Sequence, residues 1–481
     1  MRNQEPKALW ENFHSLTQIP RPSGKKEEIS KFLADYGKKL GLETVVDEIG
    51  NVIIRKPASP GYENHPGVIL QGHMDMVPQK NGDKVFDFEK DPICAYVEDN
   101  GEWVTADGTT LGADNGIGVA TAMTILADKS VVHPPLEAFF TVDEDTGMYG
   151  AQALQGGVLK GSTMLNLDSE TEGELYIGCA GGVDTTARFD FTPVATEEGD
   201  IALKVSIKGL KGGHSGCDIN LQRANANKLL FRFLKDAVAN YEARLASVEG
   251  GSLRNAIPRE AEAVITIPAE DKEDVMQLVR DYEDLFITEY NGVEDNLQFT
   301  AEEVACPKEE MPEDVQDFLI HAITVCPHGV YRMIPEMPDV VETSNNLSTI
   351  AMEGNSVKVL CLTRSSVESR KEELKQMIDS TFRIAGAEVE FSGAYPGWKP
   401  NVKSRILHVM KDIYEKEFKQ EPKVITIHAG LECGIIGRNY PGLDMISFGP
   451  TIEHPHSPDE RVNIATVQKF YRYVLAVLRA L

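Results

Sequence analysis

Short apolar runs that alternate with helical stretches place the tightest limit on the fold of this chain. The clearest runs lie at residues 67–71, 136–142 and 163–167, and a helix rich in Ala, Val, Ile and Met is expected at about 114–127. Strand–helix–strand alternation of this kind is typical of a sheet with helices on both faces. We therefore predict an α/β fold.

A segment of different character, residues 183–394, interrupts this alternation. Glycine-rich stretches at 178–182 and 393–397 flank it and are candidate hinges. Its helices are charged on one side and apolar on the other, as expected for helices packed on one face of a sheet. The elements expected within it are β-rich runs at 201–207 and 263–267 and amphipathic helices near 221–241 and 367–384.

The α/β alternation resumes after this segment, which indicates one domain inserted into another. Strands are expected near 424–427 and 445–448, followed by a final helix. A chain of 481 residues also exceeds what a single hydrophobic core normally supports. We predict a first domain in two pieces, residues 1–182 and 395–481, with an α+β domain inserted at residues 183–394.

Charge and cysteine usage exclude several classes of protein. Lys and Arg total 48 against 75 Asp and Glu, and the net charge of −27 repels nucleic acid and anionic membranes. Seven scattered cysteines without a C-x-x-C pair argue against thiolate zinc sites and a disulfide framework. The chain shows no apolar signal-peptide core and no run near the roughly 20 apolar residues of a membrane helix. We expect a cytoplasmic protein without nucleic-acid or membrane partners.

Histidine and carboxylate residues follow the predicted strands. His73 and Asp75 come directly after the run at 67–71, and residues two apart in an extended chain point to the same side. A metal-binding histidine usually donates its other ring N–H to a carboxylate, so the pair suits a ligand and its orienter. Taken alone, the short His-x-Asp pattern is more often a surface turn than a metal site.

Further residues of this kind lie at corresponding positions along the chain. Acidic residues stand at the start of the predicted helix and just beyond the other two strands, and a histidine lies in a loop near the C-terminus. In open α/β sheets ligands bind beyond the carboxyl ends of the strands, so the shared placement indicates one site. The members of this set are Asp114, Glu144, Asp145, Asp168 and His456.

Charge favours two cations at such a site. Asp114, Asp145 and Asp168 bring about −3, which is costly in one cleft without cations. Two divalent ions and a bridging hydroxide neutralise that charge, and ions about 3.5–4 Å apart would hold an attacking water and a carbonyl oxygen together. Imidazole and carboxylate ligands fit two Zn²⁺ per chain, with Mn²⁺ or Co²⁺ as substitutes.

In addition, the sequence resembles the aminoacyl-histidine dipeptidases, within the larger group of two-zinc exopeptidases. The resemblance implies a zinc exopeptidase-like catalytic domain with a mixed central sheet and helices on both faces, an inserted α+β lid domain, and a homodimer. The matching stretches, which run from residue 72 to residue 462, are GHMDMVP, TLGADNGIG, TVDEDTGMYGA, LNLDSE, KGGHSG, SLRNAIPRE, LTRSS, HAGLECG and GPTIEHPHSPDERV.

The same resemblance implies a role for each residue of the set. His73 and Asp168 would hold one zinc, Asp145 and His456 the other, and Asp114 would bridge them. Asp75 would orient His73. Glu144 would be the general base, which takes a proton from the metal-bound water and returns it to the leaving amine. The substrate contacts implied are His214, Asn255, Arg364, Gly430 and Glu432.

One metal-ligand position differs from the family pattern, and another offers two candidate histidines. The family has a second Glu where this chain has Asp145, a carboxylate shorter by one CH₂. His454 lies two residues before His456 and competes with it as a ligand, although His456 belongs to the matching His-Ser-Pro-Asp-Glu unit. We predict a metallodipeptidase that cleaves unblocked dipeptides, including Xaa-His. A related aminoacylase or carboxypeptidase, or a non-catalytic metal- or peptide-binding relative, is the alternative.

Overall fold

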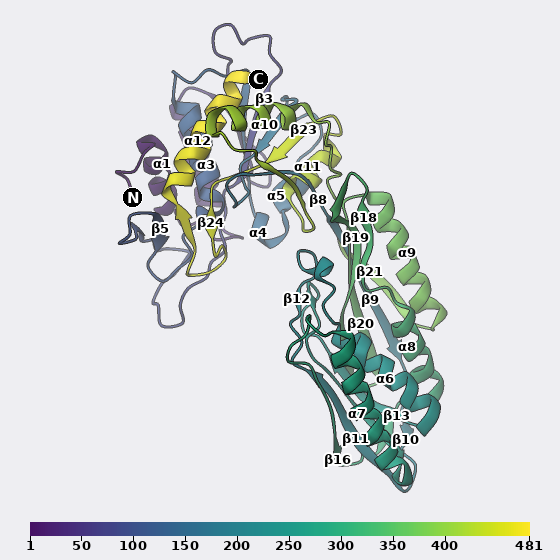
Figure 1. Ribbon diagram of the computed structural model, residues 1–481. Helices are drawn as coiled ribbons and strands as arrows, with labels where there is room; N and C mark the ends of the chain where they lie inside the picture. The colour runs from purple at the N-terminus through teal and green to yellow at the C-terminus, as the bar shows by residue number, and fades with distance from the viewer. The chain divides into compact units, whose positions relative to one another are not determined.

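The computed structural model describes residues 1–481, which form two compact units (Figure 1). The first unit comprises Met1–Gly178, Trp398–Thr426 and Leu431–Leu481, and the second comprises Cys179–Gly397 and Ile427–Gly430. Residues 427–430 therefore group with the second unit, whereas the predicted ranges put them in the first domain. No helix is both long and apolar enough to cross a membrane.

An eight-stranded mixed sheet forms the centre of the first unit. Its middle strands β6, β3, β7 and β23 run parallel to one another, and antiparallel strands complete it on both sides. This arrangement confirms the predicted mixed sheet. In spatial order the strands are β1 (Glu43–Val46), β2 (Val52–Lys56), β6 (Leu136–Thr141), β3 (Val68–His73), β7 (Thr163–Asn166), β23 (Asp444–Ser447), β8 (Glu174–Cys179) and β22 (Lys423–Ile427).

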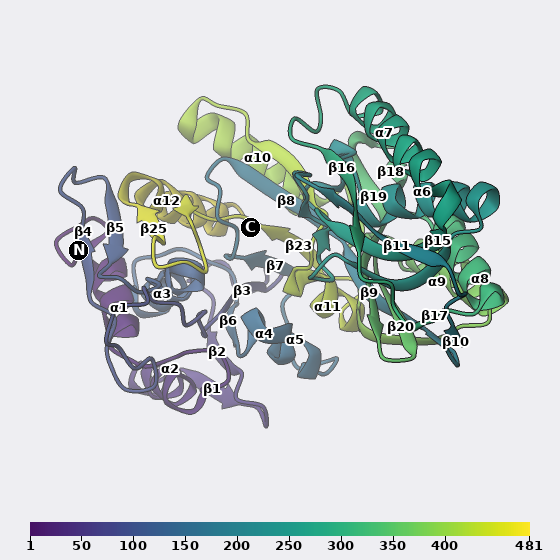
Figure 2. The same ribbon diagram turned by 90° about the horizontal axis from the view of Figure 1, so that it is seen from below.

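Helices cover both faces of this sheet, as predicted. The helices of the unit are α1 (Lys7–Thr17), α2 (Glu27–Lys39), α3 (Ala113–Ala127), α4 (Glu144–Gly147), α5 (Tyr149–Ala153), α10 (Arg405–Phe418), α11 (Glu432–Asn439) and α12 (Ile464–Ala480). Ile53, Ile69 and Phe139 point to one face and pack with α5 and α11. Gly72 faces the opposite side, where a Cβ atom would meet Asn115 of α3. Figure 2 shows α3 and α11 on opposite sides of β3 and β7.

A small antiparallel sheet brings the C-terminal loop to the first unit. Its order is β24 (Ile452–Glu453), β25 (Arg461–Asn463), β5 (Trp103–Ala106) and β4 (Ala95–Val97). β24 and β25 pair with each other, so residues 454–460 form the loop between them. β25 also pairs with β5, which anchors this loop close to the segment that leads into α3.

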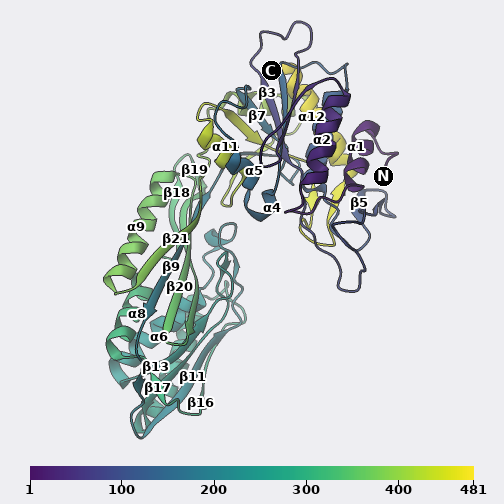
Figure 3. The ribbon, with the colours of Figure 1, turned by 180° about the vertical axis from the view of Figure 1, so that it is seen from behind.

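The second unit is an α+β structure with its helices on one face of a sheet. In spatial order the strands are β16 (Gln298–Val304), β11 (Asp200–Lys208), β15 (Ala261–Pro268), β13 (Arg244–Gly250), β19 (Met337–Glu353), β20 (Ser356–Ser365), β9 (Gly181–Asp190) and β21 (Glu388–Tyr395), and β18 (Gly329–Ile334) pairs with β19. Leu203, Val205 and Ile207 of β11 enter one buried cluster with residues of all four helices. Those helices are α6 (Ala226–Tyr241), α7 (Lys272–Glu289), α8 (Glu313–Val325) and α9 (Glu368–Ile384) (Figure 1), and Figure 3 shows α6, α8 and α9 from behind.

Candidate metal centre

His73 ends strand β3 and lies buried at the carboxyl edge of the sheet. Its Nε2 is 3.0 Å from Asp114 Oδ1 and 3.3 Å from Asp168 Oδ1. Its Nδ1 is 3.4 Å from Asp75 Oδ1, as expected for two residues on the same side of an extended segment. Ser23 Oγ donates to the other Asp75 oxygen at 2.7 Å, which fixes this carboxylate behind the imidazole.

Asp114 lies between two histidines from distant parts of the chain. Its Oδ1 faces His73, and its Oδ2 is 3.1 Å from His456 Nε2. The helix N-cap is Gly112, and Asp114 has extended backbone angles (φ −78°, ψ 112°) within the first turn. An ordinary capping aspartate would occupy the N-cap and accept a backbone N–H, so capping does not explain this residue.

His456 completes the cluster from the loop between β24 and β25. Its Nε2 is 3.2 Å from Asp145 Oδ1, and Asp145 lies in the short helix α4 directly after β6. His454 belongs to none of the residue groups that could hold a metal ion, whereas His456 belongs to one of them. The geometry therefore favours His456 over His454.

Three overlapping groups have donor atoms close enough together to share a cation. They are His73–Asp114–Asp168, His73–Asp75–Asp145 and Asp114–Asp145–His456, with the ligand atoms of each within 4.8 Å of one another. Asp145 Oδ2 is buried and has no hydrogen-bond partner in the protein, and Asp168 Oδ1 is buried with only the 3.3 Å ion-pair contact to His73 Nε2. Buried carboxylate oxygens normally have partners, so these atoms fit a bound cation.

Without cations, protons balance the charge of this cluster. Hydrogen bonds and charge from Asp114 and Asp145 raise the pKa of His456 to about 11. Burial lowers the pKa of His73, but Asp168 and Asp145 outweigh that effect, and the pKa is well above its usual value. Burial raises the pKa of Glu170 to about 8, and the charges of Asp114 and Asp168 add to this. Divalent cations would supply positive charge to the same carboxylates.

Glu144 opens α4 beside the metal cluster. Its backbone N–H donates to Asp75 Oδ1 at 3.1 Å, so Asp75 contacts both the segment of this residue and His73. Burial raises the pKa of the Glu144 carboxyl well above its usual range; His73 opposes this effect, and Asp168 reinforces it. The carboxyl can thus exchange a proton nearer neutral pH than an exposed glutamate can.

Glu432, the first residue of α11, is a second buried carboxylate near this cluster. Gln71 Nε2 and Thr141 Oγ1 donate to its Oε2 at 2.6 and 2.8 Å, whereas Oε1 is buried without a hydrogen-bond partner. Burial raises the pKa of Glu432 to about 8, with His73 opposing and Asp168 adding to the shift. A cationic partner at Oε1 would relieve this penalty.

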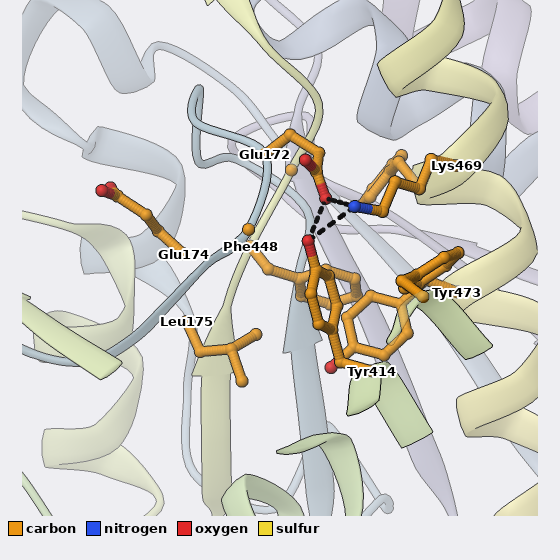
Figure 4. A pocket seen from close by; sticks show the side chains of 11 residues that line it. Glu172, Glu174, Leu175, Tyr414, Phe448, Lys469 and Tyr473 are labelled. Atoms are coloured by element: carbon orange, nitrogen blue, oxygen red, sulfur yellow. Dashed lines mark hydrogen bonds and ion pairs between the residues drawn. The ribbon is translucent and has the colours of Figure 1, made fainter. Parts of the chain in front are cut away.

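An aromatic cluster anchors the segment that follows Asp168. Lys469 donates to Tyr414 at 2.7 Å and lies 2.8 Å from Glu172, and Tyr414 donates to Glu172 at 2.5 Å (Figure 4). The Lys469 ammonium is also 4.6 Å from the centres of the Tyr414 and Phe418 rings. The adjoining cavity of ≈ 10 Å³ has room for little more than one water, so the cluster is structural.

The second unit holds most of the predicted substrate contacts. Arg364 of β20 is buried and donates to Tyr395 at 2.9 Å. His214 Nδ1 accepts the backbone N–H of Gly216 and Cys217 at 3.2 and 3.0 Å, which leaves the proton of the neutral ring on Nε2. Asn255 is exposed in a turn, and Gly430 lies in the short stretch 427–430.

His428, for which the sequence pattern suggested no role, lies close to two of these residues. Its Nε2 is 2.7 Å from Ser344 Oγ. Burial, followed by the charges of Arg364 and His214, lowers the pKa of His428 to about 3. It therefore stays neutral. This residue belongs to the matching stretch HAGLECG, but the resemblance implied no role for its side chain.

Comparison with known proteins decides the family. Residues 69–480 match the model of peptidase family M20/M25/M40. The chain belongs to this family. Membership makes it a hydrolase of peptide bonds and confirms the predicted metallopeptidase class.

Similarity to two members of the M20 family extends over nearly the whole chain. The cytosol non-specific dipeptidase of Escherichia coli K12 is 45% identical over 475 residues, covering 98% of this chain and 97% of the relative. The crystal structure of aminoacylhistidine dipeptidase from Vibrio alginolyticus is 48% identical, with a TM-score of 0.95 and coverage of 100% and 98%. The predicted resemblance is thereby confirmed. Aminopeptidase PepT of Bacillus cereus, at 17% identity and a TM-score of 0.58 over 99% and 98% of the two chains, shares the fold.

Proposed function

We propose that this M20 peptidase is a dipeptidase that uses two divalent cations to hydrolyse unblocked dipeptides, including Xaa-His. One observation carries the proposal: the two oxygens of Asp114 face different histidines, His73 at 3.0 Å and His456 at 3.1 Å. A carboxylate held in this way can bridge two cations. The full-length similarity to two proteins named as dipeptidases supports short peptides as the substrates.

In this proposal each cation has its own pair of ligands besides Asp114. His73 and Asp168 would hold one, and Asp145 and His456 the other. Nitrogen and carboxylate oxygen donors suit zinc, with manganese or cobalt as substitutes. The buried oxygen Asp145 Oδ2, which has no hydrogen-bond partner, and the position of Asp168 Oδ1 beside His73 support this assignment. Asp145 stands where the family has the longer glutamate, and its 3.2 Å distance from His456 Nε2 supports its role as a ligand.

The chemistry divides between the cations and the chain. Two bound cations would polarise the scissile carbonyl and make the attacking water more acidic. Glu144 would take the proton of that water and deliver it to the leaving amine, a task that its raised pKa suits. Asp75 would accept the Nδ1 proton of His73 and hold the backbone N–H of Glu144, so that one carboxylate orients both a ligand and the base.

Glu432 would recognise the free amino group of the substrate. Its Oε2 is held by Gln71 and Thr141, which leaves Oε1 for an ammonium group. A cation there would lower the raised pKa of this carboxyl and restore its negative charge. This contact would explain a requirement for unblocked dipeptides, because an acylated amine carries no charge.

The substrate contacts of the second unit would recognise oxygen atoms. Arg364 would bind the terminal carboxylate, since a guanidinium matches a carboxylate bidentately. His214 would donate its Nε2 proton to the carbonyl oxygen as negative charge develops there. Asn255 and Gly430 would complete the contacts. The predicted domain ranges and the hinge role of residues 178–182 and 393–397 belong to the same proposal.

A substrate panel tests the activity. Metal-stripped protein, reconstituted with zinc, is assayed against unblocked dipeptides, N-acetylated dipeptides and N-acetylated amino acids. We expect turnover of the unblocked dipeptides only, with Xaa-His among them. Preferred turnover of acetylated amino acids would identify an aminoacylase, and preferred cleavage of acetylated dipeptides a carboxypeptidase. Metal binding without any turnover would identify a non-catalytic relative.

Three finer points belong to the same proposal. Zinc is proposed as the native metal from the donor types. A cytoplasmic location is proposed because the Escherichia coli relative is named a cytosol non-specific dipeptidase. A homodimer is proposed from the family resemblance. Sedimentation of the purified protein would test the dimer directly.

A further inference from the structure

The turn at Leu111–Asp114 lies between two buried, oppositely charged side chains that have no part in the proposed reaction. Glu460 and Arg21 are each 2% exposed. They come from opposite ends of the sequence, and neither is a candidate metal ligand. Burying a charge is costly unless the protein satisfies it completely, so such a pair demands a structural reason.

Glu460 accepts four consecutive backbone N–H groups of this turn. Its Oε2 accepts from Leu111 and Gly112 at 2.8 and 2.9 Å, and its Oε1 accepts from Ala113 and Asp114 at 2.7 and 3.2 Å. Only an ionised carboxylate has enough acceptor sites on two oxygens for this task. Its charge also suits the N-terminus of α3.

Arg21 satisfies carbonyl groups on the same turn and on the neighbouring strand end. It donates to the carbonyls of Met74 and Asp75, both at 3.0 Å, and to that of Gly112. A Cβ atom at Gly112 would lie 2.5 Å from the guanidinium, and this residue has φ +70°. Glycine is therefore required where Arg21 meets the turn.

We infer that Glu460 and Arg21 are positioning residues that hold the bridging carboxylate of Asp114 in place. Glu460 belongs to the same loop as His456, and Arg21 binds the backbone just after His73. Through hydrogen bonds to the main chain, the two side chains connect the turn that carries Asp114 with the segments that carry His73 and His456. The spacing between His73, Asp114 and His456 then depends on two residues that never touch the cations. This inference rests on the proposed two-cation function.

Glu460→Gln tests the inference most directly. The amide keeps one acceptor oxygen and turns an NH₂ group toward two backbone N–H groups. We expect zinc affinity, measured by chelator competition well below the unfolding temperature, to fall about 10–100-fold, the usual effect of losing a group that orients ligands. At saturating zinc, kcat should fall while KM changes little. Co²⁺ absorption spectra of the loaded protein should show altered ligand geometry.

Glu453→Gln is the matched control, because Glu453 lies at the start of the same loop, is partly exposed and pairs only with Arg461 at the loop's other end. It should keep wild-type zinc affinity. If Glu460→Gln does not fold, Arg21→Lys replaces it: one ammonium cannot span three carbonyls, and zinc affinity should again fall. Wild-type affinity and spectra in a folded variant would overturn the inference. Absence of zinc binding by the wild type would instead contradict the proposed function.

Discussion

Replacing Glu144 by Gln should separate catalysis from metal binding. The amide has nearly the same shape, and the backbone N–H of residue 144 can still donate to Asp75 at 3.1 Å. None of the residue groups that could hold a metal includes Glu144, so the metal content should not change. What is lost is a group that can accept a proton from water.

The expected loss of activity follows from the role of Glu144 as general base. General-base catalysis contributes about 10²–10⁴-fold, so kcat should fall by that factor, equivalent to about 3–5 kcal/mol of transition-state stabilisation. KM should stay within about threefold, since no contact with the ground state is assigned to this side chain. The burial that raises the pKa of Glu144 also makes its charged form costly, so the neutral variant should fold at least as stably.

The assay combines steady-state hydrolysis of an unblocked dipeptide with metal analysis of the same sample. Asp143→Asn is the matched control: the neighbouring carboxylate accepts from the Gly24 N–H at 2.7 Å, which an amide oxygen can also do. Asn also tolerates the φ of +55° at this position, so the control should retain most of its activity. A Glu144→Gln variant with full metal and near-normal kcat would refute the role of the base.

Three further predictions concern the metal and the substrate. Asp114→Ala should lose most bound zinc and at least about 10³-fold in kcat/KM, because it removes a ligand of both cations; metal analysis and kinetics would expose any retained activity. Glu432→Gln should raise KM for unblocked dipeptides about 10-fold or more while kcat changes less, since an amide cannot pair with an ammonium group; an unchanged KM would remove this contact. The metal-free protein should lose stability as pH rises from about 5 to 8, because Glu170 and Glu432 have native pKa values of about 8 against an ordinary value of 4.5. The native state then holds more protons than the unfolded state across that window, and chemical unfolding at several pH values should show the decline.

The strands that precede the candidate metal ligands could be predicted because their sequence patterns are local. The runs that become β3, β6 and β7 are rich in apolar residues and fully buried, and their parallel ends meet at one edge of the sheet. Residues placed after such strands must converge, which brings His73 and Asp168 together. In the second unit α7 is harder to recognise, since it buries only Val275, Val279 and Phe286 along 18 residues.

The residues that hold the cluster in place could not be predicted from local patterns. Glu460 meets Asp114 across 346 positions of sequence, and Arg21 meets Gly112 across 91. Nothing in the spacing around either residue differs from that of a surface charge. The backbone of Asp114 could not be predicted for a related reason: its extended conformation within the first turn of α3 depends on contacts that only the tertiary structure supplies.

Zinc titration of the metal-free enzyme tests the two-cation account most directly. Hydrolysis of an unblocked dipeptide is followed as zinc is added in known equivalents at a protein concentration far above the dissociation constant. The account predicts that bound zinc reaches two equivalents per chain and that activity plateaus at the same point. Full activity without zinc, or a plateau of both binding and activity at one equivalent, would contradict it.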